Sequence, residues 1–124
     1  MTKDELLGKE LSNLYAIAKQ VNSYFNDSDI SFLSEGAQRS LVNYVKFSSK
    51  NEEQVARALR NLEINPGNTT DSIVQEMTEN LRVITNQKGL DTEVRELGFT
   101  LSLSRLISYH LANINNLDYR GRKI

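Results

Sequence analysis

The stretch Leu11–Phe25, LSNLYAIAKQVNSYF, decides the fold class, because its apolar residues recur at steps of three and four. This spacing places them on one face of an α-helix, and the face begins one turn earlier, at Leu7. Thr2 and Glu5 have the spacing of a capping box, so the helix is predicted to start there. The apolar face comprises Leu7, Leu11, Leu14, Ala18, Val21 and Phe25.

Three later segments have the same helical periodicity: roughly Ser34 to Leu62, from about Thr70, and about Thr92 to Leu117. No segment alternates polar and apolar residues as a half-buried strand does. We therefore predict an all-α fold, a four-helix bundle with up-down connections.

Turn residues separate the four segments. The only proline lies in NPGN, Asn65–Asn68, and a helix cannot continue through this proline and glycine. Gly89 follows the third segment as a glycine follows a helix C-terminus, and Asp91 or Thr92 can cap the fourth. The polar stretch NDSDIS, Asn26–Ser31, supplies the remaining break. These breaks leave four segments.

Composition limits the possible functions. The chain has 124 residues, so we predict one helical-bundle domain over 1–124, with 118–124 as a flexible tail. Its 15 basic and 16 acidic residues favour neither nucleic acid nor an anionic membrane as a partner. No cysteine is present, which excludes disulfides and thiolate metal sites. The sequence MTKDELLGKE lacks the apolar run of a signal peptide, and no stretch is apolar enough for a membrane span, so we expect a cytoplasmic protein.

The fourth segment carries two apolar stripes, and a helix that is apolar on two faces is either central or paired with another subunit. The first stripe comprises Val94, Leu97, Leu101, Ser104, Ser108 and Leu111. The second comprises Phe99, Leu103, Ile107, His110 and Ile114. We expect the second stripe to face outwards and to form the interface of a homo-oligomer, most simply a dimer.

Few residues are candidates for chemistry. His110 is the only histidine, and a lone histidine on an apolar helix is typical of a core or interface side chain, so no catalytic residue is assigned. Glu52 interrupts the apolar stripe of the second segment, which makes Glu52 and His110 weak candidates for metal ligands. A dinuclear site in a helical bundle uses a Glu-x-x-His motif, but Ile107 stands three residues before His110, so that motif is absent.

Three stretches share a pattern with a known family: LYAIAKQ at Leu14–Gln20, NPGNTTD at Asn65–Asp71 and EVRELGFTLSLSRLISYHLANI at Glu93–Ile114. They resemble the ferritin-like family of small bacterial YciE/YciF-type stress proteins. Their order and spacing agree with the family over roughly Leu11 to Leu117. The resemblance implies a ferritin-like bundle and a stress-associated role.

The resemblance also implies where metal ligands would lie, and other residues occupy those places. Ala18 replaces a glutamate of the first helix, while Phe47 and Lys50 replace a His-x-x-Glu pair of the second. Gln75 replaces an acidic residue of the third helix. In the fourth, the family's Glu-His-Tyr-Glu run falls on Ile107, Ser108, Tyr109 and His110, so only the tyrosine is retained. We therefore expect the metal site to be lost, with no cofactor.

Three functions stay open. The first is a non-enzymatic ferritin-like bundle with a stress-associated, structural or interaction role, which self-associates. The second is a metal-binding ferritin-like redox or stress protein, of the di-iron type, that uses ligands such as Glu52 and His110. The third is a helical adaptor that docks another protein on an apolar face, which sequence alone does not separate from self-association.

Overall fold

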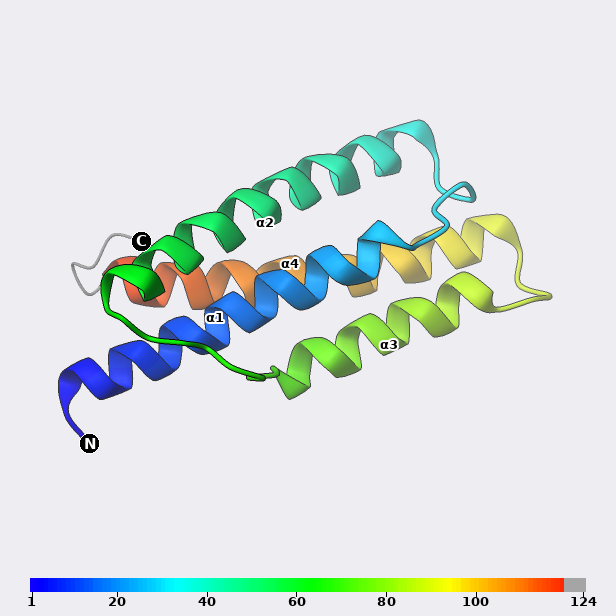
Figure 1. The fold of residues 1–124 in the computed structure, drawn as a ribbon. Coiled ribbons are helices and arrows are strands. Elements are labelled where there is room, and N and C mark those ends of the chain that lie inside the picture. Colours follow the sequence, from blue (N-terminus) through cyan, green and yellow to red (C-terminus); the bar gives the residue numbers. More distant parts are fainter. Residues whose placement is uncertain (120–124) are drawn as a thin grey trace.

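The computed structural model describes the backbone of residues 1–119 and the side chains of residues 1–117. Within this part the chain forms four α-helices and no strand, and consecutive helices run antiparallel (Figure 1). The predicted all-α four-helix bundle with up-down connections is confirmed. The helices are α1 Lys3–Asn26, α2 Glu35–Asn61, α3 Ser72–Asn86 and α4 Thr92–Tyr119.

Capping side chains and a glycine turn set the helix ends. The Thr2 hydroxyl accepts the Glu5 N–H at 3.1 Å and starts α1 as predicted. The Asp71 carboxylate accepts the Val74 N–H at 2.8 Å and starts α3. Gly89, between α3 and α4, has φ +89°, a left-handed conformation that suits glycine. The first two residues of the predicted tail, 118 and 119, belong to α4, and 120–124 lie outside the described residues.

Helix α1 occupies the centre of the bundle. It packs against each of the other helices, α3 also packs on α4, and α2 makes its main contacts with α1 (Figure 1). The consecutive residues Ala16, Ile17 and Ala18 are all buried. Since consecutive helical residues point about 100° apart, α1 is covered over most of its circumference. Ala18, at the place of the family's glutamate, is a packing residue.

The connection from α2 to α3 crosses over α1 (Figure 1). At the crossing, Ile64 lies on Gly8, and a Cβ at residue 8 would clash with the Ile64 side chain. The missing side chain of Gly8 therefore lets the connection pass close to α1. This close passage brings Asp71, at the start of α3, against α1.

The orientation of α4 differs from our expectation. Phe99, Leu103, His110 and Ile114 are at most 9% exposed, and Ile107 packs against the same core. The prediction that these residues form an outward interface was wrong, because they are already covered by this chain's own helices. The outward stripe is the other one, which we call the outer α4 face: Val94, Leu97, Leu101, Ser104, Ser108 and Leu111.

Across residues 1–119, none of the helices combines the length and apolarity that crossing a membrane requires.

Candidate functional site

A buried carboxylate joins three helices. Asp71 Oδ2 accepts hydrogen bonds from Asn13 Nδ2 of α1, at 3.0 Å, and from the Tyr109 hydroxyl of α4, at 2.8 Å. Its Oδ1 accepts the Val74 N–H within α3. We call Asp71, Asn13, Gln20 and Tyr109 the Asp71 junction. It lies where the three stretches that carry the family resemblance meet.

The backbone of Asp71 is also held by α1. Gln20 Oε1 accepts the Asp71 N–H at 2.8 Å, and Gln20 Nε2 donates to the Asp71 carbonyl at 3.1 Å. Asp71 is 5% exposed, and a carboxylate at such depth is tolerated only when donors surround it. Asp71 was not predicted as a site residue, although aspartate directly before an apolar helical segment is a preferred N-cap.

The junction keeps the Tyr109 phenol protonated. Burial, followed by the hydrogen bond to Asp71 and the charge of Asp71, raises the pKa of Tyr109 to about 12. At neutral pH the phenol is thus a hydrogen-bond donor to the carboxylate. It is poorly suited to proton transfer, which is most efficient when the pKa lies near the working pH.

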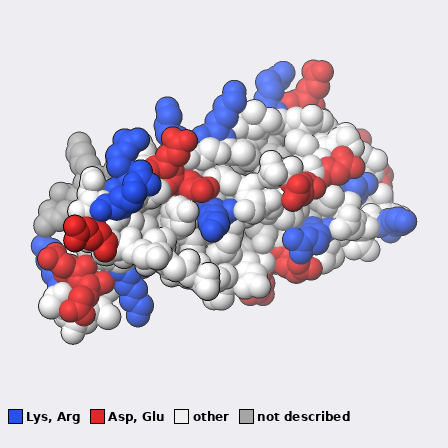
Figure 2. Space-filling model, in the orientation of Figure 1, with Lys and Arg blue, Asp and Glu red and all other residues white. Residues whose placement is uncertain are grey.

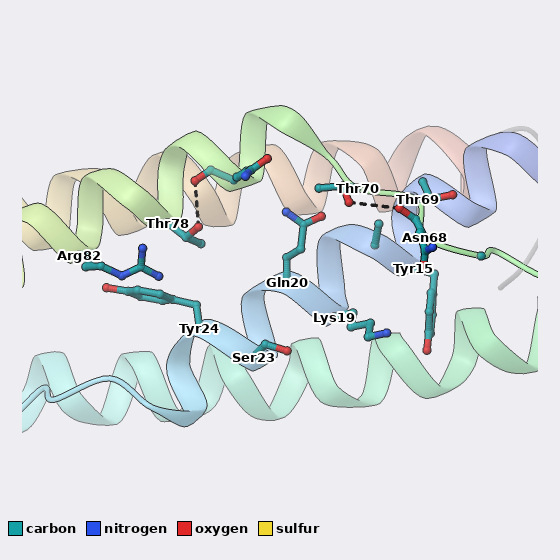
Figure 3. A pocket seen from close by; sticks show the side chains of 13 residues that line it. Tyr15, Lys19, Gln20, Ser23, Tyr24, Asn68, Thr69, Thr70, Thr78 and Arg82 are labelled. Carbon is teal, nitrogen blue, oxygen red and sulfur yellow. Dashed lines mark hydrogen bonds between the residues drawn. The ribbon is translucent and has the colours of Figure 1, made fainter.

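A polar groove lies beside the junction, between α1, the segment 67–70 and α3 (Figure 3). Its volume is about 530 Å³, within the size range of small-molecule sites. Figure 3 places Lys19 with Tyr15 at one end of the groove and Arg82 with Tyr24 at the other. Lys19 Nζ lies 5.9 Å from the centre of the Tyr15 ring, and the Arg82 guanidinium lies 5.7 Å from that of Tyr24.

His110 belongs to a second polar centre, between α2 and α4. Its Nε2–H donates to Asn51 Oδ1 at 3.2 Å, so Nδ1 is the acceptor of the Tyr44 hydroxyl at 2.8 Å. Burial lowers the pKa of His110 from its ordinary value of 6.5 to about 4, so the ring is neutral at pH 7. Both ring nitrogens are occupied, which leaves neither for a metal ion or a substrate. Neither Tyr44 nor Asn51 was predicted from the sequence as a partner of His110.

Glu52 does not join His110. Its carboxylate accepts a hydrogen bond from Asn22 Nδ2 of α1 at 2.7 Å and is half-buried. The two weak metal-ligand candidates therefore have separate partners on different helices. No group of three or more metal-binding side chains is found in the part of the chain that the structure describes.

The positions at which the resemblance implies metal ligands are also dispersed. Ala18 is buried, whereas Phe47 is 43% exposed, and Lys50 and Gln75 are exposed as well. Ile107 is partly buried against the core. These five positions do not line a common interior site.

Charge is mixed over the face that contains the groove. In Figure 2, acidic and basic side chains are interspersed; basic side chains project along the upper edge, where α2 lies in Figure 1, with an acidic one at its right end. This distribution agrees with a formal net charge of -1.

Comparisons with known protein families, with curated proteins and with solved structures find no significant match to this chain. The resemblance to YciE/YciF-type proteins therefore stays a prediction.

The substitution Asp71→Asn tests the junction. An amide in place of the carboxylate turns one accepting oxygen into a donor, which faces either the Val74 N–H or the two donors Asn13 and Tyr109. We therefore expect the free energy of unfolding to fall by about 1–3 kcal/mol. Urea unfolding measures this change. Asp91→Asn is the matched control, because Asp91 is exposed and caps α4 through the Glu93 N–H; its effect should stay within about 0.5 kcal/mol. If both substitutions lowered the free energy of unfolding by the same amount, the bonds of Asp71 to α1 and α4 would not stabilise the fold, which would contradict our interpretation.

Because His110 is buried in its neutral form, we expect the free energy of unfolding to fall in acid. The unfolded chain takes up a proton at His110 as the pH falls below 6.5, whereas the folded chain does so only near pH 4. The contribution of neutral His110 is therefore complete above pH 6.5 and is lost towards pH 4, at about 1.4 kcal/mol per pH unit and about 3 kcal/mol in total. Urea unfolding measures this loss. Between pH 6.5 and pH 4 the free energy of unfolding should fall more in the wild type than in His110→Gln, which lacks the imidazole.

An NMR titration of the single histidine provides an independent check. We expect the ring carbon-bound protons to shift with a midpoint near pH 4 while the chain stays folded. A midpoint near 6.5 would mean that the ring is solvated, in contradiction to the buried hydrogen-bonded centre.

Proposed function

We propose that this protein is a non-catalytic helical bundle that self-associates through the outer α4 face. The observation that carries the proposal is the exposure of large apolar side chains on a helix whose opposite face is already in the core. The exposed fractions are 55% for Val94, 60% for Leu97, 50% for Leu101 and 38% for Leu111. Exposed apolar stripes of this kind are typical of interaction surfaces.

The spacing of the outer α4 face suits a second helix. Its six positions, from Val94 to Leu111, follow one another at steps of three, four, three, four and three. This is the a/d spacing of a coiled-coil seam, which packs against another helix with the same spacing. No charged residue occupies the seam, and Ser104 and Ser108 are small enough for close approach of the helices. A second copy of the chain supplies a matching seam.

The size of the seam predicts a weak dimer. Eighteen helical residues, Val94 to Leu111, extend about 27 Å at 1.5 Å per residue. A single helix pair of that length belongs to the small end of specific interfaces, below about 1,200 Å² in total. We therefore expect association that depends on protein concentration.

The buried polar centres support a non-catalytic role. His110 is neutral with both ring nitrogens bonded, and Tyr109 donates to Asp71 with a pKa raised to about 12. These groups stabilise the bundle and are not poised for proton transfer. A stress-associated role of the ferritin-like kind rests on the sequence resemblance, and metal binding through Glu52 and His110 would require both to leave their present partners.

The test is the mass of the purified chain by light scattering over a range of concentrations. The wild type should approach twice the chain mass of 14.1 kDa as concentration rises. Leu101→Asp should hold it at the mass of one chain, because a charge in the seam is desolvated on association. Ile107→Asp is unsuitable, since Ile107 packs against the core.

Val42→Asp is the matched control, because Val42 is 45% exposed and lies on α2. It should leave the association unchanged. A wild type that stays at the mass of one chain up to about millimolar concentration would overturn the proposal and favour docking of a different protein. Association that is unchanged in Leu101→Asp would assign it to another surface.

A further inference from the structure

We infer that the groove over α1 binds a small organic anion that carries hydroxyl groups, of the class of a phosphorylated or carboxylated polyol, with Lys19 and Arg82 as its charged contacts. This inference is independent of self-association, since the groove lies between α1 and α3 and includes no residue of the outer α4 face.

The charge of the groove selects for an anion. Among the side chains that line it, Lys19 and Arg82 are charged and none is acidic. Lys19 is exposed and makes no ion pair within residues 1–117. Arg82 pairs with Glu79 one turn away, but both side chains are more than half exposed, and such pairs contribute little. Its guanidinium has further N–H groups for a ligand.

The nearest buried negative charge does not oppose this selection. The Asp71 carboxylate is outside the lining, and its oxygens accept three hydrogen bonds from Asn13, Val74 and Tyr109. These donors offset its charge locally. An anion in the groove would therefore meet the two cations first.

The aromatic rings fix where the cations lie. Lys19 and Arg82 each lie against a tyrosine ring, at opposite ends of the groove (Figure 3). A cation over an aromatic face is attracted to it, which limits the positions that the flexible side chain visits. Two charged ends favour an elongated ligand with an anionic group at one or both ends.

The middle of the groove offers hydrogen bonds for a hydroxylated body. Between the cations lie the amide of Gln20 and the hydroxyl of Ser23, with Thr70 and Thr78 on the opposite wall (Figure 3). The Thr70 and Thr78 hydroxyls already donate to backbone carbonyls, so they offer a ligand acceptor sites, whereas the Ser23 hydroxyl can donate and accept. Gln20 keeps one amide N–H beyond its two bonds to the Asp71 backbone. This mixture of donors and acceptors suits the hydroxyl groups of a polyol. The lining is more polar than apolar, so a purely hydrophobic ligand is disfavoured.

The walls are held in place before any ligand binds. Gln20 is fixed by its two hydrogen bonds to the Asp71 backbone. In the 67–70 wall, the Thr69 hydroxyl donates to the Pro66 carbonyl at 2.6 Å, and Asn65 Oδ1 accepts the Gly67 N–H at 2.9 Å. A site ordered in advance loses less entropy when it binds.

The experiment is isothermal titration of the full chain with fructose 1,6-bisphosphate, alongside glucarate, fructose and inorganic phosphate. We expect the bisphosphate or glucarate to bind more tightly than fructose and phosphate, and the better of the two identifies the anionic group. Lys19→Met and Arg82→Met should each weaken that binding by about fivefold or more, because each removes one charged contact. Amide NMR shifts should centre on Asn68–Thr70.

Two exposed cations of α2 provide matched controls, Lys46→Met and Arg39→Met, which should leave binding unchanged. All four substitutions are at exposed positions, so their melting temperatures should match that of the wild type. Three results would overturn the inference: no binding of either anion, binding that is unchanged in Lys19→Met and Arg82→Met, or inorganic phosphate that binds as tightly as the bisphosphate.

Discussion

The buried carboxylate of Asp71 is the constraint on which the arrangement of α1, α3 and α4 depends. A charge at 5% exposure is stable only if its donors stay in place, and these donors come from Asn13, Val74 and Tyr109 on three helices. Shifting any one of these helices would leave the carboxylate short of a partner. Asp71 can lie against α1 because Gly8, which has no side chain, lets the α2–α3 connection pass close over that helix.

Helix α2 is fixed by different means. It packs mainly on α1, and its link to α4 runs through His110, which bonds to Tyr44 and Asn51. The Asp71 junction thus joins α1, α3 and α4, and the polar centre at His110 joins α2 to α4. Because the side chains of both centres are bonded within the bundle, our proposals rest on two surface features instead, the outer α4 face and the groove over α1.

Periodicity predicted the four helices and their order, because a 3.6-residue repeat in apolar residues is a local signal. It failed where two apolar stripes share one helix, because both stripes are apolar in sequence. The inner face is the one whose residues find partners elsewhere in the chain: Phe99 packs against Phe32, and His110 bonds to two side chains of α2. Burial of Asp71, Tyr44 and Asn51 was missed for a related reason. A polar residue is stable in the core only if donors and acceptors from distant segments bond to it. A single sequence does not show which distant segments lie side by side.

The central claim is that the outer α4 face meets a second copy of itself, and site-directed cross-linking tests it most directly. The chain has no cysteine, so a single cysteine placed at Ser104, or in a separate variant at Ser108, is the only reactive thiol. With a short bismaleimide, the account predicts a covalent species of twice the chain mass for these variants and little for a control cysteine at the exposed Ser40 of α2. Equal cross-linking of the seam and control cysteines would contradict it.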